Sequence, residues 1–240
     1  MEASATPTGA QNASGPAIAS PWIAQLWWFV GGAAAAFLVP FVFSAVLDLH
    51  HDVYLAVYFA FVIGFITTYI RRSGIDLGES IRRNWVWGAV AGVVVGVPVV
   101  RNVFTETETA RPDGLYFVFE LVWRGFTYGA LDAVLLTVFP CLLVYKAIGG
   151  PLTTWRKRAG YFAASLALVM TITATYHLGY EHYRDVGVGA PETGNSLISL
   201  PMLLTANPIG SVIDHSAMHA AAVIHEYEGE TRLPPQADVP

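Results

Sequence analysis

The sequence predicts an all-α, polytopic membrane protein with about six to seven transmembrane helices, including a short re-entrant or half segment near 195–206. Hydrophobic residues make up 54% of the chain and charged residues only 13%, about half the charged fraction of a typical soluble domain. The mean hydropathy is +0.48, and the apolar residues are gathered in runs long enough to cross a bilayer. Together these features favour one domain of packed helices whose main partner is the lipid bilayer.

Both ends of the chain differ from this apolar middle. Residues 1–21 are small, polar and Pro/Gly-bearing, which predicts a disordered tail. The predicted membrane domain covers 22–226, and 227–240 are expected to form a polar C-terminal tail. The net charge of −5 comes without a basic tract, so nucleic acid is not an expected partner. The single cysteine, Cys141, lies in an apolar run and forms no intrachain disulfide.

Five apolar runs are long enough to be spanning helices. They cover approximately residues 22–47, 53–70, 85–104, 115–148 and 156–180. Polar segments separate them: a hinge with two histidines at 48–52, a basic loop at 71–83, an acidic loop at 105–114 and a Gly-Gly-Pro turn at 149–151.

The fourth run is apolar but carries four polar side chains at a regular spacing of four residues. These are Glu120, Arg124, Tyr128 and Asp132, which form a ridge along one side of a helix. A membrane helix keeps ionisable groups only where they face protein or a wet cavity. The upper half, Glu120 with Arg124, is expected to carry chemistry, or to be a simple ion pair. Tyr128 and Asp132 are expected to serve helix packing.

The distribution of Lys and Arg predicts an orientation. Eight of the thirteen Lys and Arg residues lie at 71–83 and 146–158, and two spans separate these loops, so both are expected to be cytoplasmic. The N-terminus is then cytoplasmic as well, in the plasma membrane of a bacterium or archaeon. The loops at 48–52, 105–114 and 181–195 are expected outside.

The last third of the chain has two interpretations. Residues 195–206 are apolar but too short to span comfortably, and Asn207-Pro208 interrupts the run before a further helix at 209–224. One interpretation is a single kinked span. We favour the other, in which 195–206 re-enters and the last helix runs inward from the outer side. That arrangement would bring His215 to the depth of Glu120 and His177.

The histidines are the main candidates for chemistry. His215 and His219 are four residues apart, so both rings face one way with room for a shared ligand. With Glu120 and His177 they suffice for a site in which Glu is the general base and His stabilises an oxyanion. A divalent metal such as zinc is an alternative, with His177, His215 and His219 as candidate ligands. His50 and His51 are expected to be solvated in their hinge.

The order of these motifs resembles the CPBP family of CAAX proteases and bacteriocin-processing intramembrane endopeptidases, over about residues 115–225. Glu120 and Arg124, in Phe119-Glu120-Leu-Val-Trp-Arg124-Gly125, resemble the first motif of the family. His177 resembles the second, and His215 with His219 the third. The sequence departs from the family pattern in three places. Phe119 stands where the family has the first Glu of a pair, Thr173 replaces a Phe, and His219 replaces Asn or Asp.

The resemblance implies an intramembrane peptidase that cleaves a membrane-associated peptide at a Glu/His site in the outer half of the membrane. Its catalytic residues would be Glu120, Arg124, His177, His215 and His219. Two alternatives stay open. The first is a catalytically inactive scaffold or binding protein of the same fold, which the missing first Glu favours. The second is an outward-facing divalent-metal-binding membrane protein.

Overall fold

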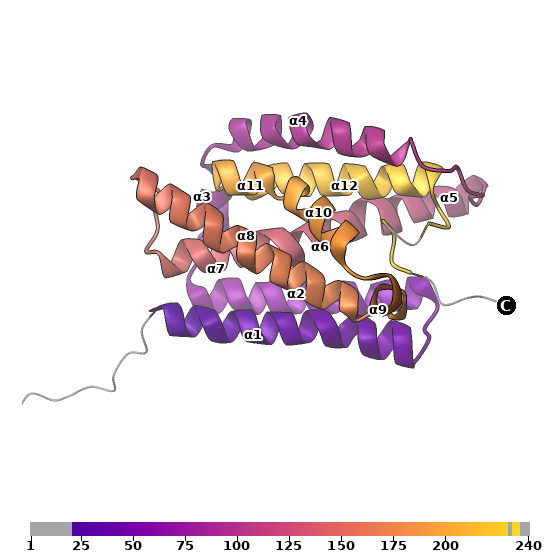
Figure 1. Ribbon diagram of the computed structural model, residues 1–240, viewed down its shortest axis with the longest axis horizontal. Helices are drawn as coiled ribbons and strands as arrows, with labels where there is room; N and C mark the ends of the chain where they lie inside the picture. Colours follow the sequence, from indigo (N-terminus) through magenta and orange to yellow (C-terminus); the bar gives the residue numbers. More distant parts are fainter. Residues whose placement is uncertain (1–20, 230–231, 236–240) are drawn as a thin grey trace, which may run out of the picture.

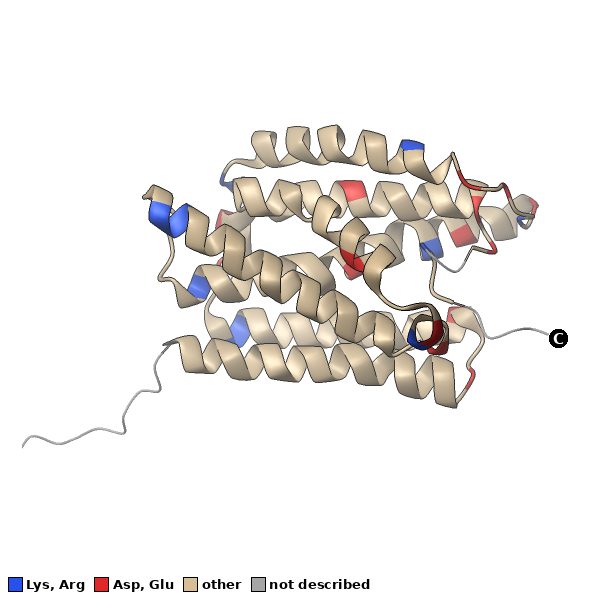
Figure 2. Cartoon of the chain, viewed as in Figure 1, with Lys and Arg blue, Asp and Glu red and all other residues tan. Residues whose placement is uncertain are grey.

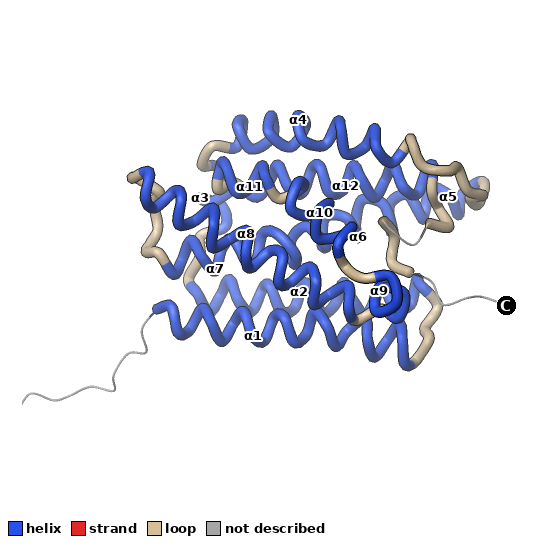
Figure 3. The backbone as a smooth tube through the Cα atoms, viewed as in Figure 1, coloured by secondary structure: helices blue, strands red, loops and turns tan. Residues whose placement is uncertain are grey.

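The computed structural model describes residues 21–229 and 232–235, and these form a bundle of helices (Figure 1). No β-strand is present in this part of the chain (Figure 3), so the predicted all-α class is confirmed. The expected disordered tail at 1–21 lies outside the described residues apart from Pro21, which begins the first helix.

The helices follow one another with short connections. In chain order they are α1 (Pro21–Pro40), η1 (Phe41–Val46), α2 (His51–Ser73), α3 (Leu77–Arg82), α4 (Trp85–Val103), α5 (Gly114–Glu120), η2 (Leu121–Thr127), α6 (Tyr128–Ala133), η3 (Val134–Val138), α7 (Phe139–Ala147), α8 (Trp155–Leu178), α9 (Glu181–Val186), α10 (Gly189–Ile198), α11 (Leu200–Thr205) and α12 (Pro208–His225). The η segments are π-helical turns: η1 extends α1, and η2 and η3 continue the helices on either side of them.

Five of the described helical stretches are long and apolar enough to cross a membrane. They cover Trp22–Val46, His51–Ser73, Trp85–Val103, Gly114–Ala147 and Trp155–Leu178, which confirms the five predicted runs within a few residues. The fourth, from α5 to α7, is the most buried of these and forms the centre of the bundle. Its two π-helical turns flank α6, and such turns are frequent at functional sites.

The two ends of the bundle differ in charge (Figure 2). Most Lys and Arg residues lie where α2, α3, α7 and α8 begin or end, and we call this side the basic end. The opposite side carries the connections 47–50, 104–113 and 179–188 and is called the acidic end. The N-terminal end of α1 lies at the basic end (Figure 1).

The last third of the chain crosses the bundle twice. α10 and α11 together run from the acidic end to the basic end, and α12 returns beside α4 (Figure 1). The amide of Asn207, at the start of α12, donates hydrogen bonds to the carbonyls of Ser80, Ile81 and Arg83 at the basic end. At the other end of α12, the N–H of Thr109 donates to the carbonyl of His225.

The expectation that the last helix starts on the outer side and runs inward is therefore wrong. The apolar run at 195–206 is only the second half of this crossing, because α10 already begins at Gly189 and α11 follows it after Ser199. The polar residues of α10 hid this first half of the crossing.

A row of glycines brings α12 against α4. Gly88, Gly92 and Gly96 lie four residues apart and are buried in α4. A Cβ atom added at Gly92 would lie 2.5 Å from the carbonyl oxygen of Gly210 in α12. Small residues at this spacing let two helices in a membrane approach closely. This contact sets the depth and the rotation of α12, which carries His215 and His219.

Candidate functional site

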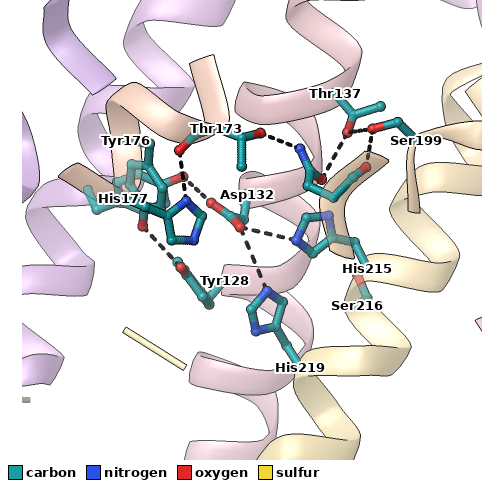
Figure 4. A network of polar contacts seen from close by, with 12 residues as sticks. Tyr128, Asp132, Thr137, Thr173, Tyr176, His177, Ser199, His215, Ser216 and His219 are labelled. Carbon is teal, nitrogen blue, oxygen red and sulfur yellow. Dashed lines mark hydrogen bonds and ion pairs between the residues drawn. The ribbon is translucent and has the colours of Figure 1, made fainter. Parts of the chain in front are cut away.

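Three buried side chains from two helices meet near the middle of the bundle (Figure 4). His215 Nε2 lies 3.1 Å from Asp132 Oδ2, and His219 Nε2 lies 3.7 Å from the same oxygen. The two imidazole rings stack with centroids 5.0 Å apart. Asp132, His215 and His219 are each only 3% exposed. We call these three residues the Asp132 centre.

Local packing explains why the Asp132 centre forms. His215 and His219 follow one another by one helical turn of α12, so both rings point to the same side. Gly129 in α6 permits the close approach, because a Cβ there would lie 2.8 Å from Ser216 Cα and 3.1 Å from the ring of His219. A larger residue at this position would push the two histidines away from Asp132.

Asp132 is the site residue that sequence reasoning missed. It was expected to serve packing, yet it joins both histidines and also accepts a 2.9 Å hydrogen bond from the hydroxyl of Tyr58. The available signal was that an ionisable residue within an apolar span marks a functional site by default. The sequence does not identify its partners, because they depend on the direction in which α12 crosses the bundle.

His177 lies on α8 beside the Asp132 centre (Figure 4). Its Nδ1 lies 2.8 Å from the carbonyl oxygen of Thr173. A carbonyl only accepts, so Nδ1 carries the proton and Nε2 keeps a free lone pair. The hydroxyl of Thr173 in turn accepts a 2.6 Å hydrogen bond from Asn195, which ties α8 to α10. His177 is therefore held in the tautomer that suits a metal ligand or a proton acceptor.

A cavity of about 980 Å³ opens above these groups. Asp132, His177, His215 and His219 line its polar part. Its walls are mostly apolar and come from α4, α10 and α11, including Val94, Pro98, Leu197, Ile198 and Leu200. Towards the acidic end, Glu106, Arg232 and Pro234 also line it. Part of the predicted polar tail thus borders the cavity, and Leu233 beside it is buried.

One wall of the cavity carries tyrosine hydroxyls that bond to one another. The hydroxyls of Tyr128 and Tyr176 lie 3.0 Å apart, those of Tyr176 and Tyr180 lie 2.6 Å apart, and those of Tyr180 and Tyr54 lie 2.5 Å apart. These groups are buried, so each hydroxyl needs its neighbour as a partner. Three of these tyrosines, Tyr128, Tyr176 and Tyr180, line the cavity beside its polar part.

Glu120 and Arg124 lie elsewhere. Glu120 Oε1 is 3.6 Å from His51 Nε2, and Glu120 Oε2 is 3.7 Å from Arg124 Nη1. Twelve residues separate Glu120 from Asp132, which is about 18 Å along a helix axis. The guanidinium of Arg124 also lies over the ring of Tyr227. Burial raises the pKa of the Tyr227 hydroxyl, and the negative charge of Glu120 raises it further.

The structure therefore brings together three of the five predicted site residues. His177, His215 and His219 line the cavity, whereas Glu120 and Arg124 are not among its lining residues. His51, expected to be solvated in its hinge, has a side chain only 10% exposed.

The Asp132 centre has the composition and spacing of a metal site. One ligand atom from each of its residues lies within 4.8 Å of the other two. Zinc bound tetrahedrally at about 2.0–2.1 Å separates neighbouring ligand atoms by about 3.3 Å, close to the 3.1 and 3.7 Å observed. Both ring nitrogens of His219 are buried without a hydrogen bond, which is costly unless another partner binds. A metal ion at Nε2 would supply one.

In comparisons with known proteins, no family model, curated protein or solved structure matches the chain.

Proposed function

We propose that the chain is an intramembrane hydrolase that uses a divalent metal ion held by Asp132, His215 and His219. The observation that carries this proposal is the convergence of these three buried groups on the polar part of a large, mostly apolar cavity. Such a cavity with a few convergent polar groups is the default site for a ligand.

A divalent metal ion held there would lower the pKa of a water molecule that it binds to near neutrality and so supply a nucleophile at neutral pH. Two histidines and one carboxylate are a common protein ligand set for catalytic zinc, and leave a position open for water. His177 would then act as a fourth ligand or accept a proton, because its Nε2 keeps a free lone pair. The hydroxyl of Tyr58 holds the second oxygen of Asp132 and orients the carboxylate.

The substrate is expected to come from the membrane. Two residues of the cavity wall, Val94 and Leu197, are 65% and 50% exposed on the flank of the bundle. An apolar substrate would therefore enter from the lipid between α4 and α10. The resemblance to the CPBP family favours a membrane-associated peptide as the substrate class.

The Glu120-based mechanism implied by that resemblance has less support. The ion pairs of Glu120 are with His51 and Arg124, about 18 Å from the Asp132 centre along the helix. Phe119, in the place of the first Glu, stacks on Tyr116 and Trp123. We therefore assign these residues no part in hydrolysis. An inactive scaffold or binding protein is the second candidate, and the apolar side chain of Phe119 is the observation that favours it.

We further propose that the basic end is cytoplasmic, which would place the N-terminal end of α1 inside and the end of α12 outside. The charge difference between the two ends supports this orientation. Labelling of single cysteines placed at Glu108 and at Lys157 in sealed vesicles, in a Cys141→Ala background, tests it. The cysteine at 108 should react from outside only, and the opposite pattern would reverse the orientation.

The experiment for the proposed activity uses the full chain in lipid nanodiscs with membrane-spanning reporter peptides. We expect cleavage that stops on chelation, returns with Zn²⁺, and is absent from the His215→Ala/His219→Ala variant. Turnover that resists chelation and is abolished by Glu120→Gln would instead support the Glu120-based peptidase. Absence of turnover together with tight peptide binding would support the non-catalytic alternative.

A further inference from the structure

A second group of ionisable side chains lies at the acidic end, outside the cavity. His51 and Asp52 begin α2, and Glu120 ends α5. His51 Nε2 lies 3.4 Å from Asp52 Oδ1 and 3.6 Å from Glu120 Oε1. His51 Nε2 thus lies close to one carboxylate oxygen from each of two helices.

These atoms are buried and lack hydrogen bonds. Glu120 is 0% exposed and neither of its carboxylate oxygens accepts a hydrogen bond. The same holds for Asp52 Oδ1 and His51 Nε2. Nearly all buried polar atoms in folded proteins have a partner, and an ionised carboxylate is especially costly to bury alone. Arg124 offsets the charge of one of the two carboxylates, and a cation beside His51 Nε2 would supply the partner that the remaining atoms lack.

The other oxygen of each carboxylate contacts a neighbouring side chain that is not one of these three residues. The hydroxyl of Tyr116 donates a 3.2 Å hydrogen bond to Asp52 Oδ2, and Arg124 Nη1 lies 3.7 Å from Glu120 Oε2. Each carboxylate thus has one oxygen fixed by a neighbour and the other directed towards His51. Outer contacts of this kind orient the ligands of metal sites.

We propose that His51, Asp52 and Glu120 form a second divalent-cation site, separate from the Asp132 centre. The distances of 3.4 and 3.6 Å match the separation of about 3.3 Å between neighbouring ligands of tetrahedral zinc. One imidazole and two carboxylates suit a zinc-class ion.

The charges at this site favour a cation. If His51 is neutral, the two carboxylates and the guanidinium of Arg124 have a net charge of −1. A bound divalent ion would change this net charge to +1. The exposed ring of His50 lies over that of His51 and supplies a further nitrogen near Asp52. The bound ion would link the first turn of α2 to the end of α5 and so fix the acidic end of the central helix.

The test uses the full chain in which the Asp132 centre is disabled by His215→Ala/His219→Ala. The metal-stripped protein is titrated with Zn²⁺, and the bound zinc is counted by mass spectrometry of the folded fraction. We expect one zinc ion per chain in this background and two in the unaltered chain. Adding His51→Ala should weaken the remaining binding at least 100-fold. Tyr116→Phe, which leaves all three ligands, should weaken it about 10-fold to 100-fold.

Glu108→Gln is the matched control, because Glu108 is an exposed carboxylate at the same end, and it should leave zinc binding unchanged. A background that binds no zinc, or binding that His51→Ala leaves intact, would overturn the second site. If the second site binds zinc and the Asp132 centre does not, the proposed hydrolase is overturned and this inference is not. The two outcomes are therefore distinguishable.

Discussion

Replacement of Gly92 by alanine tests the contact that positions the histidines of α12. A Cβ at this position would lie 2.5 Å from the carbonyl oxygen of Gly210, whereas ordinary contacts begin at 3.4 Å. The two helices must therefore separate by about 0.9 Å (3.4 − 2.5). Overpacking of this kind costs about 1–3 kcal/mol. A displacement of about 1 Å at a catalytic site lowers the rate about 100-fold.

The matched control is Gly64→Ala in α2, where a Cβ would meet nothing within 4 Å. Alanine favours a helix over glycine by about 1 kcal/mol, so this variant should be as stable as the parent or slightly more stable. Thermal unfolding in detergent and zinc affinity should be measured for both variants. Equal melting temperatures and equal zinc affinities for Gly92→Ala and Gly64→Ala would refute the proposed role of the α4–α12 contact.

Three other perturbations probe the fold and the site. Asn207→Ala removes the amide that donates to three carbonyls at the basic end. This change should lower the free energy of unfolding by about 1–3 kcal/mol. An unchanged denaturant midpoint would contradict the assigned start of α12. Tyr58→Phe removes the hydrogen bond to Asp132 and should weaken zinc binding about 10-fold to 100-fold without unfolding the protein, which calorimetry would measure. With free zinc at 100 times its dissociation constant, chelation should remove about 2.7 kcal/mol of stability. A melting temperature insensitive to both chelator and zinc would argue against a metal ion in the folded state.

Hydrophobic patterning is sufficient to predict the five long spanning helices, but it does not predict the crossing formed by α10 and α11. The five long runs are visible because each is continuous, and their bounds agree with the structure within a few residues. The sixth crossing combines the polar start of α10 with the apolar α11, so neither half has the length of a span. Its direction is fixed by the bonds of Asn207 to residues 80–83, and sequence periodicity carries no information about such a distant contact.

The same limit explains the partial prediction of the site. The spacing of His215 and His219 places both rings on one face of α12 and is readable from the sequence. Which carboxylate they meet depends on how α6 packs against α12, and this follows from Gly129 and its contact with Ser216. Asp132 and Glu120 occupy equivalent positions on the predicted ridge, so spacing alone did not distinguish them.

The measurement that tests the central claim most directly is an experimental structure of the zinc-loaded protein with anomalous diffraction collected at the zinc edge. We predict an anomalous peak within bonding distance of Asp132 Oδ2, His215 Nε2 and His219 Nε2, beside the ring of His177. Density for these side chains with no peak among them, in crystals grown with saturating zinc, would contradict it.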